Sequence, residues 1–158
     1  MRNNRVYVEQ PCRTTADCGL ARQNSPLPLI LDESVVTASD VFEAKHAAGA
    51  CGVNIKLGRV GGISGAARMR DLLQDLNMLI AIEDMWGGDV ITAAVSHLAA
   101  STRPGRLILT SFFNDWTDGH VAGYRPRSVN GRGSAPDAPG LGVSVDLDKV
   151  GAPIFTVP

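Results

Sequence analysis

Short apolar runs that alternate with stretches of helical periodicity constrain this fold more than any other feature. Each run is aliphatic or β-branched and short enough for a strand buried on both faces. The runs span residues 6–8, 27–31, 53–57, 78–82 and 107–113. Between them, residues 14–24, 37–49, 64–76 and 87–101 are typical of helices, with Thr37 or Ser39, Ser64 and Asp89 as expected N-caps and Gly49 as an expected stop.

Strand and helix alternate along the chain with short connections. This order predicts right-handed βαβ units and a parallel sheet, so the expected fold class is α/β. A length of 158 residues is typical of one domain. After Phe113 the sequence becomes rich in Gly, Pro, Asn and Asp, which predicts irregular loops. The tail from residue 143 either adds a strand or packs as an extended arm.

Charge and composition exclude some classes of partner. The chain has 15 basic and 16 acidic residues and 44% hydrophobic residues, so we expect neither nucleic acid nor a membrane as partner. No apolar run approaches the roughly 18 residues that span a bilayer. Three cysteines, an odd number without metal-type spacing, indicate free thiols and a reducing compartment, so we expect a cytoplasmic protein.

Charged or polar residues stand at the carboxyl end of every expected strand. The first strand ends in Glu9, the second in Asp32 and the third in Lys56, at intervals of 23 and 24 positions. Such an interval is about one βα unit, so these side chains should lie side by side at one rim of the sheet. In parallel α/β proteins that rim is where ligands bind.

The residue types at this rim suggest metal-assisted proton abstraction. Neighbouring carboxylates such as Glu9 and Asp32 repel each other unless a cation lies between them, and hard oxygen ligands suit Mg²⁺. Near such an ion, in a partly desolvated cleft, the pKa of Lys56 should fall, which would make it available as a general base. Metal and lysine together indicate removal of a proton next to a carboxylate, through an enediolate that the ion stabilises.

Four motifs carry a resemblance to a known family. "VEQP", "LDES", "NIKLGRVGGISGAARMRDL" and "PGLGVSVD", in this order, resemble the barrel domain of the enolase superfamily, in the branch of mandelate racemase and muconate lactonizing enzyme. The resemblance implies a partial (β/α) TIM-type barrel, strands four to eight, over residues 1–130 and a C-terminal return arm over residues 131–158. The capping domain, the first three strands, their Lys-x-Lys pair and the third metal ligand are then expected to be absent.

The resemblance also implies roles for individual residues. Glu9 and Asp32 match two of the family's Mg²⁺ ligands, and Lys56 matches its acid/base lysine. Adjacency alone suggests that Glu33 supports Lys56. The residues expected to contact a small-molecule carboxylate substrate are those that follow the last two strands: Asp84, Trp86, Asn114 and Asp115.

The stretch "EDMWGGDVITAAVSHLAAST" resembles enzymes that act on hydroxyproline or proline betaine, as dehydratases or as epimerases. An indole face attracts a ring ammonium or betaine cation, which is one role for Trp86; packing is the other, and Trp116 is a competing candidate. Dehydration and epimerisation share the enediolate, so the choice between them stays open.

Because the resemblance implies only half of an active site, two hypotheses about activity stay open. Two carboxylates hold Mg²⁺ poorly, and a partial barrel exposes two sheet edges, so we expect weak metal affinity and self-association. One reading is an enzyme that forms a homo-oligomer in its full-length form. The alternative is an inactive truncated remnant, or a half-barrel that needs a complementary N-terminal piece.

Overall fold

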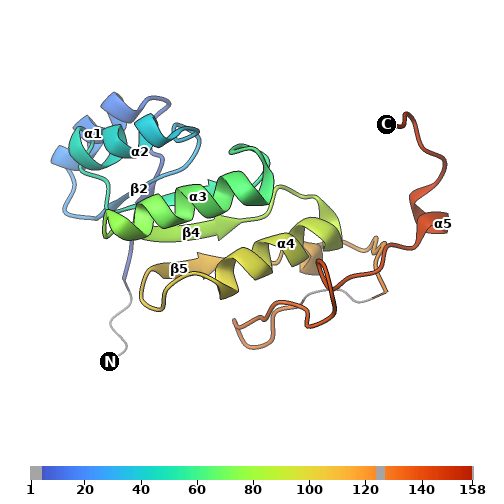
Figure 1. Ribbon diagram of the computed structural model, residues 1–158. Coiled ribbons are helices and arrows are strands. Elements are labelled where there is room, and N and C mark those ends of the chain that lie inside the picture. Colours follow the sequence, from blue (N-terminus) through green and yellow to red (C-terminus); the bar gives the residue numbers. More distant parts are fainter. Residues whose placement is uncertain (1–4, 124–126, 158) are drawn as a thin grey trace.

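Five parallel strands and the helices that connect them form the body of the molecule, as the sequence predicts (Figure 1). A computed structural model describes residues 5–123 and 127–157. The strands are β1 (Val8–Glu9), β2 (Leu29–Leu31), β3 (Gly52–Lys56), β4 (Leu79–Glu83) and β5 (Leu107–Thr110). The helices are α1 (Thr15–Gln23), α2 (Ala38–His46), α3 (Gly62–Asp75), α4 (Gly88–Ala100), the 3-10 turn η1 (Phe113–Trp116) and α5 (Leu147–Val150).

The strands lie in the sheet in their chain order, β1-β2-β3-β4-β5, and every neighbouring pair is parallel. Consecutive parallel strands joined by helices are the repeating unit of a (β/α) barrel. β1 and β5 each have one partner strand, so they form the two edges of this sheet. The architecture is therefore a partial barrel with both edges open.

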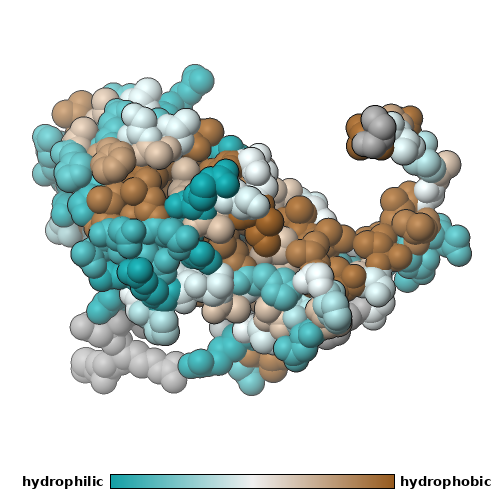
Figure 2. Space-filling model, viewed as in Figure 1, coloured by the Kyte–Doolittle hydropathy of each residue, from teal (hydrophilic) through white to brown (hydrophobic). Residues whose placement is uncertain are grey.

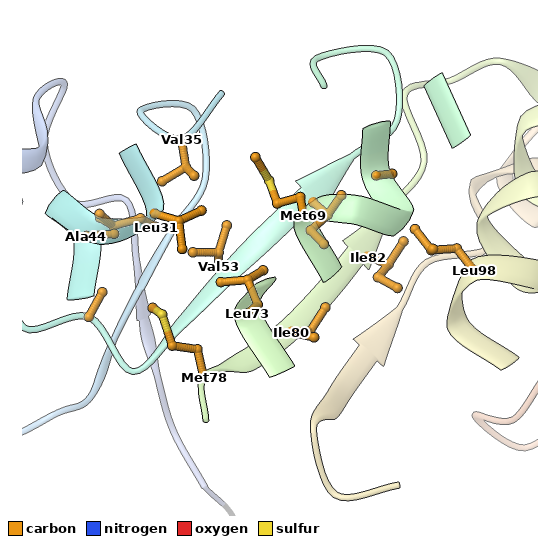
Figure 3. Close-up of a cluster of buried hydrophobic side chains, with 14 of the residues drawn as sticks. Leu31, Val35, Ala44, Val53, Met69, Leu73, Met78, Ile80, Ile82 and Leu98 are labelled. Atoms are coloured by element: carbon orange, nitrogen blue, oxygen red, sulfur yellow. The ribbon is translucent and has the colours of Figure 1, made fainter. Parts of the chain in front are cut away.

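Alternation along the central strands separates a core face from a site face. Val53 and Ile55 of β3 are completely buried beneath the helices, and Ile80 and Ile82 of β4 lie in the same core (Figure 3). Because successive side chains in a strand point to opposite faces, the residues between them lie on the other face of the sheet. That face carries Lys56, which is paired in register with Glu83.

The core itself joins the strands to α2, α3 and α4. Its buried side chains interdigitate between the sheet and the helices, as Leu31, Ala44, Leu73 and Leu98 illustrate (Figure 3). Burial of aliphatic side chains of this size stabilises a fold by about 1.5–3 kcal/mol each. The helices thus hold the strands in fixed register. The carboxyl ends of the strands therefore have fixed positions relative to one another.

One of the expected helix caps is confirmed and two are wrong. Of the two expected candidates, Thr37 and Ser39, it is Thr37 that caps α2, in a capping box with Asp40. Ser64 is not a cap, because α3 begins earlier, after Gly61 in the left-handed conformation with φ of 82°. Asp89 is not a cap either, because it lies inside α4 and its carboxylate accepts hydrogen bonds from a distant loop.

The last expected strand is shorter than predicted. β5 ends at Thr110, and the polypeptide then turns into η1, where the run was expected to continue to Phe113. Beyond η1 the described chain is mostly irregular, with isolated antiparallel bridges between Ala122 and Val145 and between Val129 and Arg132. The division of the chain at residue 130 stays a prediction.

The C-terminal arm leaves the body of the molecule at α5 (Figure 1). Hydrophobic residues lie along it and meet little of the chain (Figure 2); Ile154 is 98% exposed and Phe155 is 78% exposed. Apart from the single bridge at Val145, the described tail therefore forms no strand, and from α5 onward it does not pack on the body either. Among the described residues, no helix has both the length and the apolar character needed to cross a membrane.

Candidate active site

The carboxyl ends of β2, β3 and β4 bring a lysine and two carboxylates together. Nζ of Lys56 lies 2.7 Å from Oδ2 of Asp32 and 3.5 Å from Oε2 of Glu83. Lys56 is last in β3, Glu83 is last in β4, and Asp32 directly follows β2. The one-unit spacing in the sequence therefore predicts the juxtaposition of Asp32 and Lys56 that the structure shows.

Asp32 is the most strongly held of these groups. It is 3% exposed, and its second oxygen, Oδ1, accepts a hydrogen bond of 2.5 Å from Nη1 of Arg59. Hydrogen bonds between two charged groups are among the stronger ones in proteins. Arg59 follows β3 in a turn, and no pattern in the sequence pointed to it.

Gln10 ties the first two strands together behind the site. Its Oε1 accepts hydrogen bonds from the backbone N–H of Asp32, at 2.8 Å, and from Oγ of Ser34, at 3.1 Å. Gln10 has a positive φ of 34°, which non-glycine residues adopt rarely. Its neighbour Glu9 is held by β1 and therefore has a defined position relative to Asp32.

Three carboxylates converge at the rim. One oxygen each from Glu9, Asp32 and Glu83 lie within 4.8 Å of one another. Hard carboxylate oxygens in such a group are the ligands that Mg²⁺ takes in proteins. The donor set thus fits the metal that the sequence predicts, and it includes Glu83, which was not among the expected ligands.

Asn54 connects this group to the middle of the sheet. Its Nδ2 donates a hydrogen bond of 2.8 Å to Oε1 of Glu9. Asn54 is two residues before Lys56 on β3, so both side chains lie on the site face. It is 1% exposed, and its Oδ1 is buried without a hydrogen-bond partner among the described residues.

Among the described residues alone, the pKa of Lys56 lies above its ordinary value, and the expected fall beside a divalent cation stays a prediction. Burial by itself lowers this pKa, but the hydrogen bond from Lys56 to Asp32 and the charges of Asp32 and Glu83 outweigh burial. The expectation considered desolvation and a metal ion, and it did not include two carboxylates in contact with the amine. To act as a base, Lys56 has to lose its contact with Asp32.

Two of the expected site residues lie elsewhere. Asp84 is 1% exposed and its carboxylate accepts hydrogen bonds from the Thr92 hydroxyl and from the backbone N–H of Gly87, so it holds the start of α4. Glu33 is exposed, and the partners of Lys56 in the described structure are Asp32 and Glu83 instead. Glu83, one position before Asp84, occupies the site face.

Asn114 and Asp115 hold loops in place. Nδ2 of Asn114 donates a hydrogen bond of 3.0 Å to the buried carboxylate of Asp89. Oδ2 of Asp115 accepts hydrogen bonds of 2.9 Å from both the backbone N–H and the hydroxyl of Ser128. Neither contact prevents a role at substrate, which stays a prediction, but both give these residues a structural role.

Aromatic rings gather next to the last strand. The rings of Trp86 and Trp116 both stack on the ring of Phe113. The ring centroids are 4.6 Å apart for Trp86 and 5.0 Å apart for Trp116. Trp86 is 62% exposed and Trp116 is 72% exposed. Phe113 and Trp116 line a cavity of about 570 Å³ that also contacts Glu83. The two competing tryptophans therefore belong to one aromatic cluster.

The chain matches the family described as enolase C-terminal domain-like over residues 3–150. A partial α/β barrel with carboxylates and a lysine at its carboxyl rim belongs to this class of protein. The chain is therefore a member of the enolase C-terminal domain-like family.

Relatives with known names and structures show the same relationship. The chain is 36% identical over 149 residues to a cis-3-hydroxy-L-proline dehydratase from Roseibium aggregatum, which covers 94% of this chain and 41% of the relative. A mandelate racemase/muconate lactonizing enzyme from Roseovarius nubinhibens has a TM-score of 0.89 and 35% identity, over 99% of this chain and 43% of that one. A second enolase superfamily member from the same organism, complexed with magnesium, has a TM-score of 0.87 and 34% identity, over 97% and 42%. The chain thus spans about two-fifths of the length of these relatives.

Proposed function

We propose that this chain carries the metal-binding and basic half of an enzyme that removes the proton α to a carboxylate. The observation that carries the proposal is the contact of Lys56 with Asp32, 2.7 Å apart at the carboxyl rim of the sheet. A lysine beside carboxylates that can hold Mg²⁺ is one of the combinations that support enediolate chemistry. Magnesium in a similar structure supports the choice of metal.

Glu9 and Asp32 are the proposed Mg²⁺ ligands. The ion would supply positive charge next to the carboxylate of the substrate, where negative charge develops as the α-proton leaves. Glu9 is held by the amide of Asn54, and Asp32 by Gln10 and Arg59. The chain itself therefore orients both carboxylates before any ligand arrives, which reduces the cost of binding.

Lys56 is the proposed general base. Its contact with Asp32 favours the ammonium form, so Lys56 becomes a base only in a state in which this contact is released. The lysine then takes the α-proton. In an epimerisation a second proton donor, on the opposite face of the enediolate, would reprotonate the carbon. In a dehydration an acid would give a proton to the β-hydroxyl, which leaves as water. Both reactions pass through the same enediolate.

A proline-type acid is the proposed substrate. The similarity to a cis-3-hydroxy-L-proline dehydratase supports this class. The exposed face of Trp86, supported by its stacking on Phe113, offers the kind of aromatic surface that attracts a ring ammonium or betaine cation. In this proposal Asp84 acts indirectly, because it fixes the turn that carries Trp86.

Deuterium exchange tests this function directly. The chain is incubated in D₂O with Mg²⁺ and cis-3-hydroxy-L-proline, L-proline or proline betaine, and loss of the α-proton signal is followed by NMR. We expect slow exchange that Lys56→Ala abolishes and that Lys149→Ala, a change at an exposed lysine far from the rim, leaves intact. Equal exchange by the parent and Lys56→Ala would refute the role of Lys56.

The open edge of the sheet at β5 favours a second candidate function, in which the chain is active only together with a complementary polypeptide. β5 is an edge strand, and Leu109 on it is 45% exposed beside the cavity of about 570 Å³. To test this, the exchange assay is repeated with an added polypeptide that carries the part of the Roseibium aggregatum dehydratase that this chain does not match. Exchange that occurs only when both polypeptides are present would favour this candidate.

A further inference from the structure

Two cysteines lie together where the chain passes from β1 to α1. Cys12 is in the loop that follows β1, and Cys18 is in α1. The Cys18 thiol donates a hydrogen bond of 3.3 Å to the carbonyl oxygen of Cys12. The side chains of the two residues also interact with each other as hydrogen-bond partners. Both thiols are free in the structure, so the loop brings two reduced sulfur groups into one place.

The side-chain amide of Gln10 holds this arrangement together. Its Nε2 donates hydrogen bonds to the carbonyl oxygen of Cys12, at 2.8 Å, and to Sγ of Cys18, at 3.5 Å. Its Oε1 accepts hydrogen bonds from the backbone N–H of Asp32 and from the Ser34 hydroxyl, which fix the amide from the other side. The loop and α1 are therefore held against each other with the two cysteines at their contact.

The two thiols differ in their access to solvent. Cys18 is 0% exposed and belongs to the core, whereas Cys12 is only partly buried at the edge of that core. The pKa of Cys18 is raised, first by burial and then by the neighbouring Cys12 thiol, although the hydrogen bond to the Cys12 carbonyl lowers it in part. Because the thiolate is the reactive form, an oxidant from solvent reacts with Cys12 first. Cys18 is then the thiol next to the product.

Closure of a bond between the sulfurs requires only a local rearrangement. A disulfide needs Cα atoms within about 7 Å of each other. Sγ of Cys18 already lies 3.3 Å from the backbone of Cys12, so α1 does not have to leave the sheet. A disulfide sulfur has no proton to donate, but the Cys12 carbonyl oxygen keeps the hydrogen bond from Gln10. The bond therefore leaves no buried carbonyl without a partner at this position.

We propose that Cys12 and Cys18 form a dithiol site that hydrogen peroxide converts into an intrachain disulfide. Sγ of Cys12 attacks one peroxide oxygen, the O–O bond breaks, and the thiol proton passes to the leaving oxygen, which gives a sulfenic acid and water. Sγ of Cys18 then attacks the Cys12 sulfur. The S–S bond forms, the S–O bond breaks, and the hydroxyl leaves as water with the Cys18 proton. The thiols are oxidised and the peroxide is reduced; a small dithiol reverses the reaction by exchange.

Peptide mapping tests the inference, because Arg13 lies between the two cysteines and trypsin separates them. The chain is treated with hydrogen peroxide at low protein concentration, unfolded, blocked with N-ethylmaleimide and digested without a reductant. We expect peptides 6–13 and 14–22 to be found linked, and peptide 46–56 to carry a label on Cys51. The mass of the unlabelled chain should fall by two hydrogen atoms, and dithiothreitol should restore it.

Cys51→Ser is the matched control. The Cys51 thiol is also partly buried and donates a hydrogen bond of 3.2 Å to a carbonyl oxygen, that of Leu29. Its removal should leave the yield of the linked peptides unchanged. In Cys18→Ala the sulfenic acid of Cys12 has no partner, so trapping by dimedone should rise about fivefold or more above the parent.

The parent chain alone decides the outcome, so the test does not depend on whether Cys18→Ala folds. Three labelled cysteines after treatment with peroxide would overturn the inference, and so would links that join only different chains. Equal dimedone trapping in the parent and in a Cys18→Ala variant shown to be folded by circular dichroism would overturn the role of Cys18. None of these readouts depends on the proposed function.

Discussion

Asp89 should contribute more to stability than any exposed acidic residue of this chain. It is 1% exposed, and its carboxylate accepts hydrogen bonds from Asn114, at 3.0 Å, from the His120 ring, at 2.9 Å, and from the backbone N–H groups of Val121 and Ala122, at 3.1 Å each. One side chain on α4 thus holds both η1 and the loop behind it. Replacement by alanine removes the acceptor of all four hydrogen bonds.

The size of the effect follows from these contacts. Removal of one partner from a buried, hydrogen-bonded charged group costs about 3–5 kcal/mol, because the remaining groups stay desolvated. For a domain of this size, about 2–4 °C of melting temperature corresponds to each kcal/mol. We therefore expect Asp89→Ala to lower the melting temperature by roughly 6–20 °C.

The pH dependence has a defined sign. Burial raises the pKa of Asp89. The hydrogen bonds from His120, Asn114 and Ala122 together lower the pKa by more than burial raises it, so the net pKa lies below its ordinary value. A carboxyl with a depressed folded-state pKa stabilises the fold above its unfolded pKa, about 3.9. That stabilisation is lost as the pH falls through the folded-state value. The parent should therefore lose stability below about pH 4, and Asp89→Ala should lose less.

Thermal unfolding followed by circular dichroism from pH 3 to pH 7 measures both effects. Asp118→Ala is the matched control, since Asp118 is an exposed acid in the same loop. Equal melting temperatures of Asp89→Ala and Asp118→Ala at pH 7 would refute the reasoning. An unchanged acid dependence in Asp89→Ala would refute the assignment of that dependence to Asp89.

Three further predictions follow from other contacts. Lys56→Met should strengthen Mn²⁺ binding by about 1 kcal/mol or more, because it removes a competing cation from Asp32; weaker binding in a calorimetric titration would contradict this. Gly65→Ala should destabilise the chain by about 1–3 kcal/mol in urea, because the added Cβ would lie 1.8 Å from a backbone carbonyl oxygen, whereas Gly119→Ala meets no atom within 4 Å and should be neutral. Trp86→Ala should weaken binding of proline betaine by about 0.5–2 kcal/mol in a calorimetric titration, and an unchanged affinity would place the cation elsewhere.

Periodicity was enough to predict the sheet, and also the contact of Lys56 with Asp32, which comes from a neighbouring strand. The interval from Asp32 to Lys56 is one βα unit, and a parallel sheet converts that interval into contact. Thr37 was predictable as a cap for a similar reason, because its partner Asp40 is only three positions away. Features that depend on a short, regular separation along the chain are those that the sequence reveals.

The errors have a different physical origin. Glu83 and Asp84 are adjacent, and the pleat sends one to the site and the other into the α4 turn. The bulky residues Ile80 and Ile82 indicate which face of β4 is the core, and that alternation would have selected Glu83. Arg59 gave no such signal, because a turn residue acquires its partner only when the loop folds over the rim.

The two open sides of the sheet constrain the symmetry of an assembly in which one side pairs with the other. The open edges of β1 and β5 lie at opposite ends of the strand order. Pairing of β5 in one molecule with β1 in the next would be a heterologous contact, which repeats from copy to copy. Such a contact ends only if the rotation between copies closes a ring, and otherwise it produces a filament.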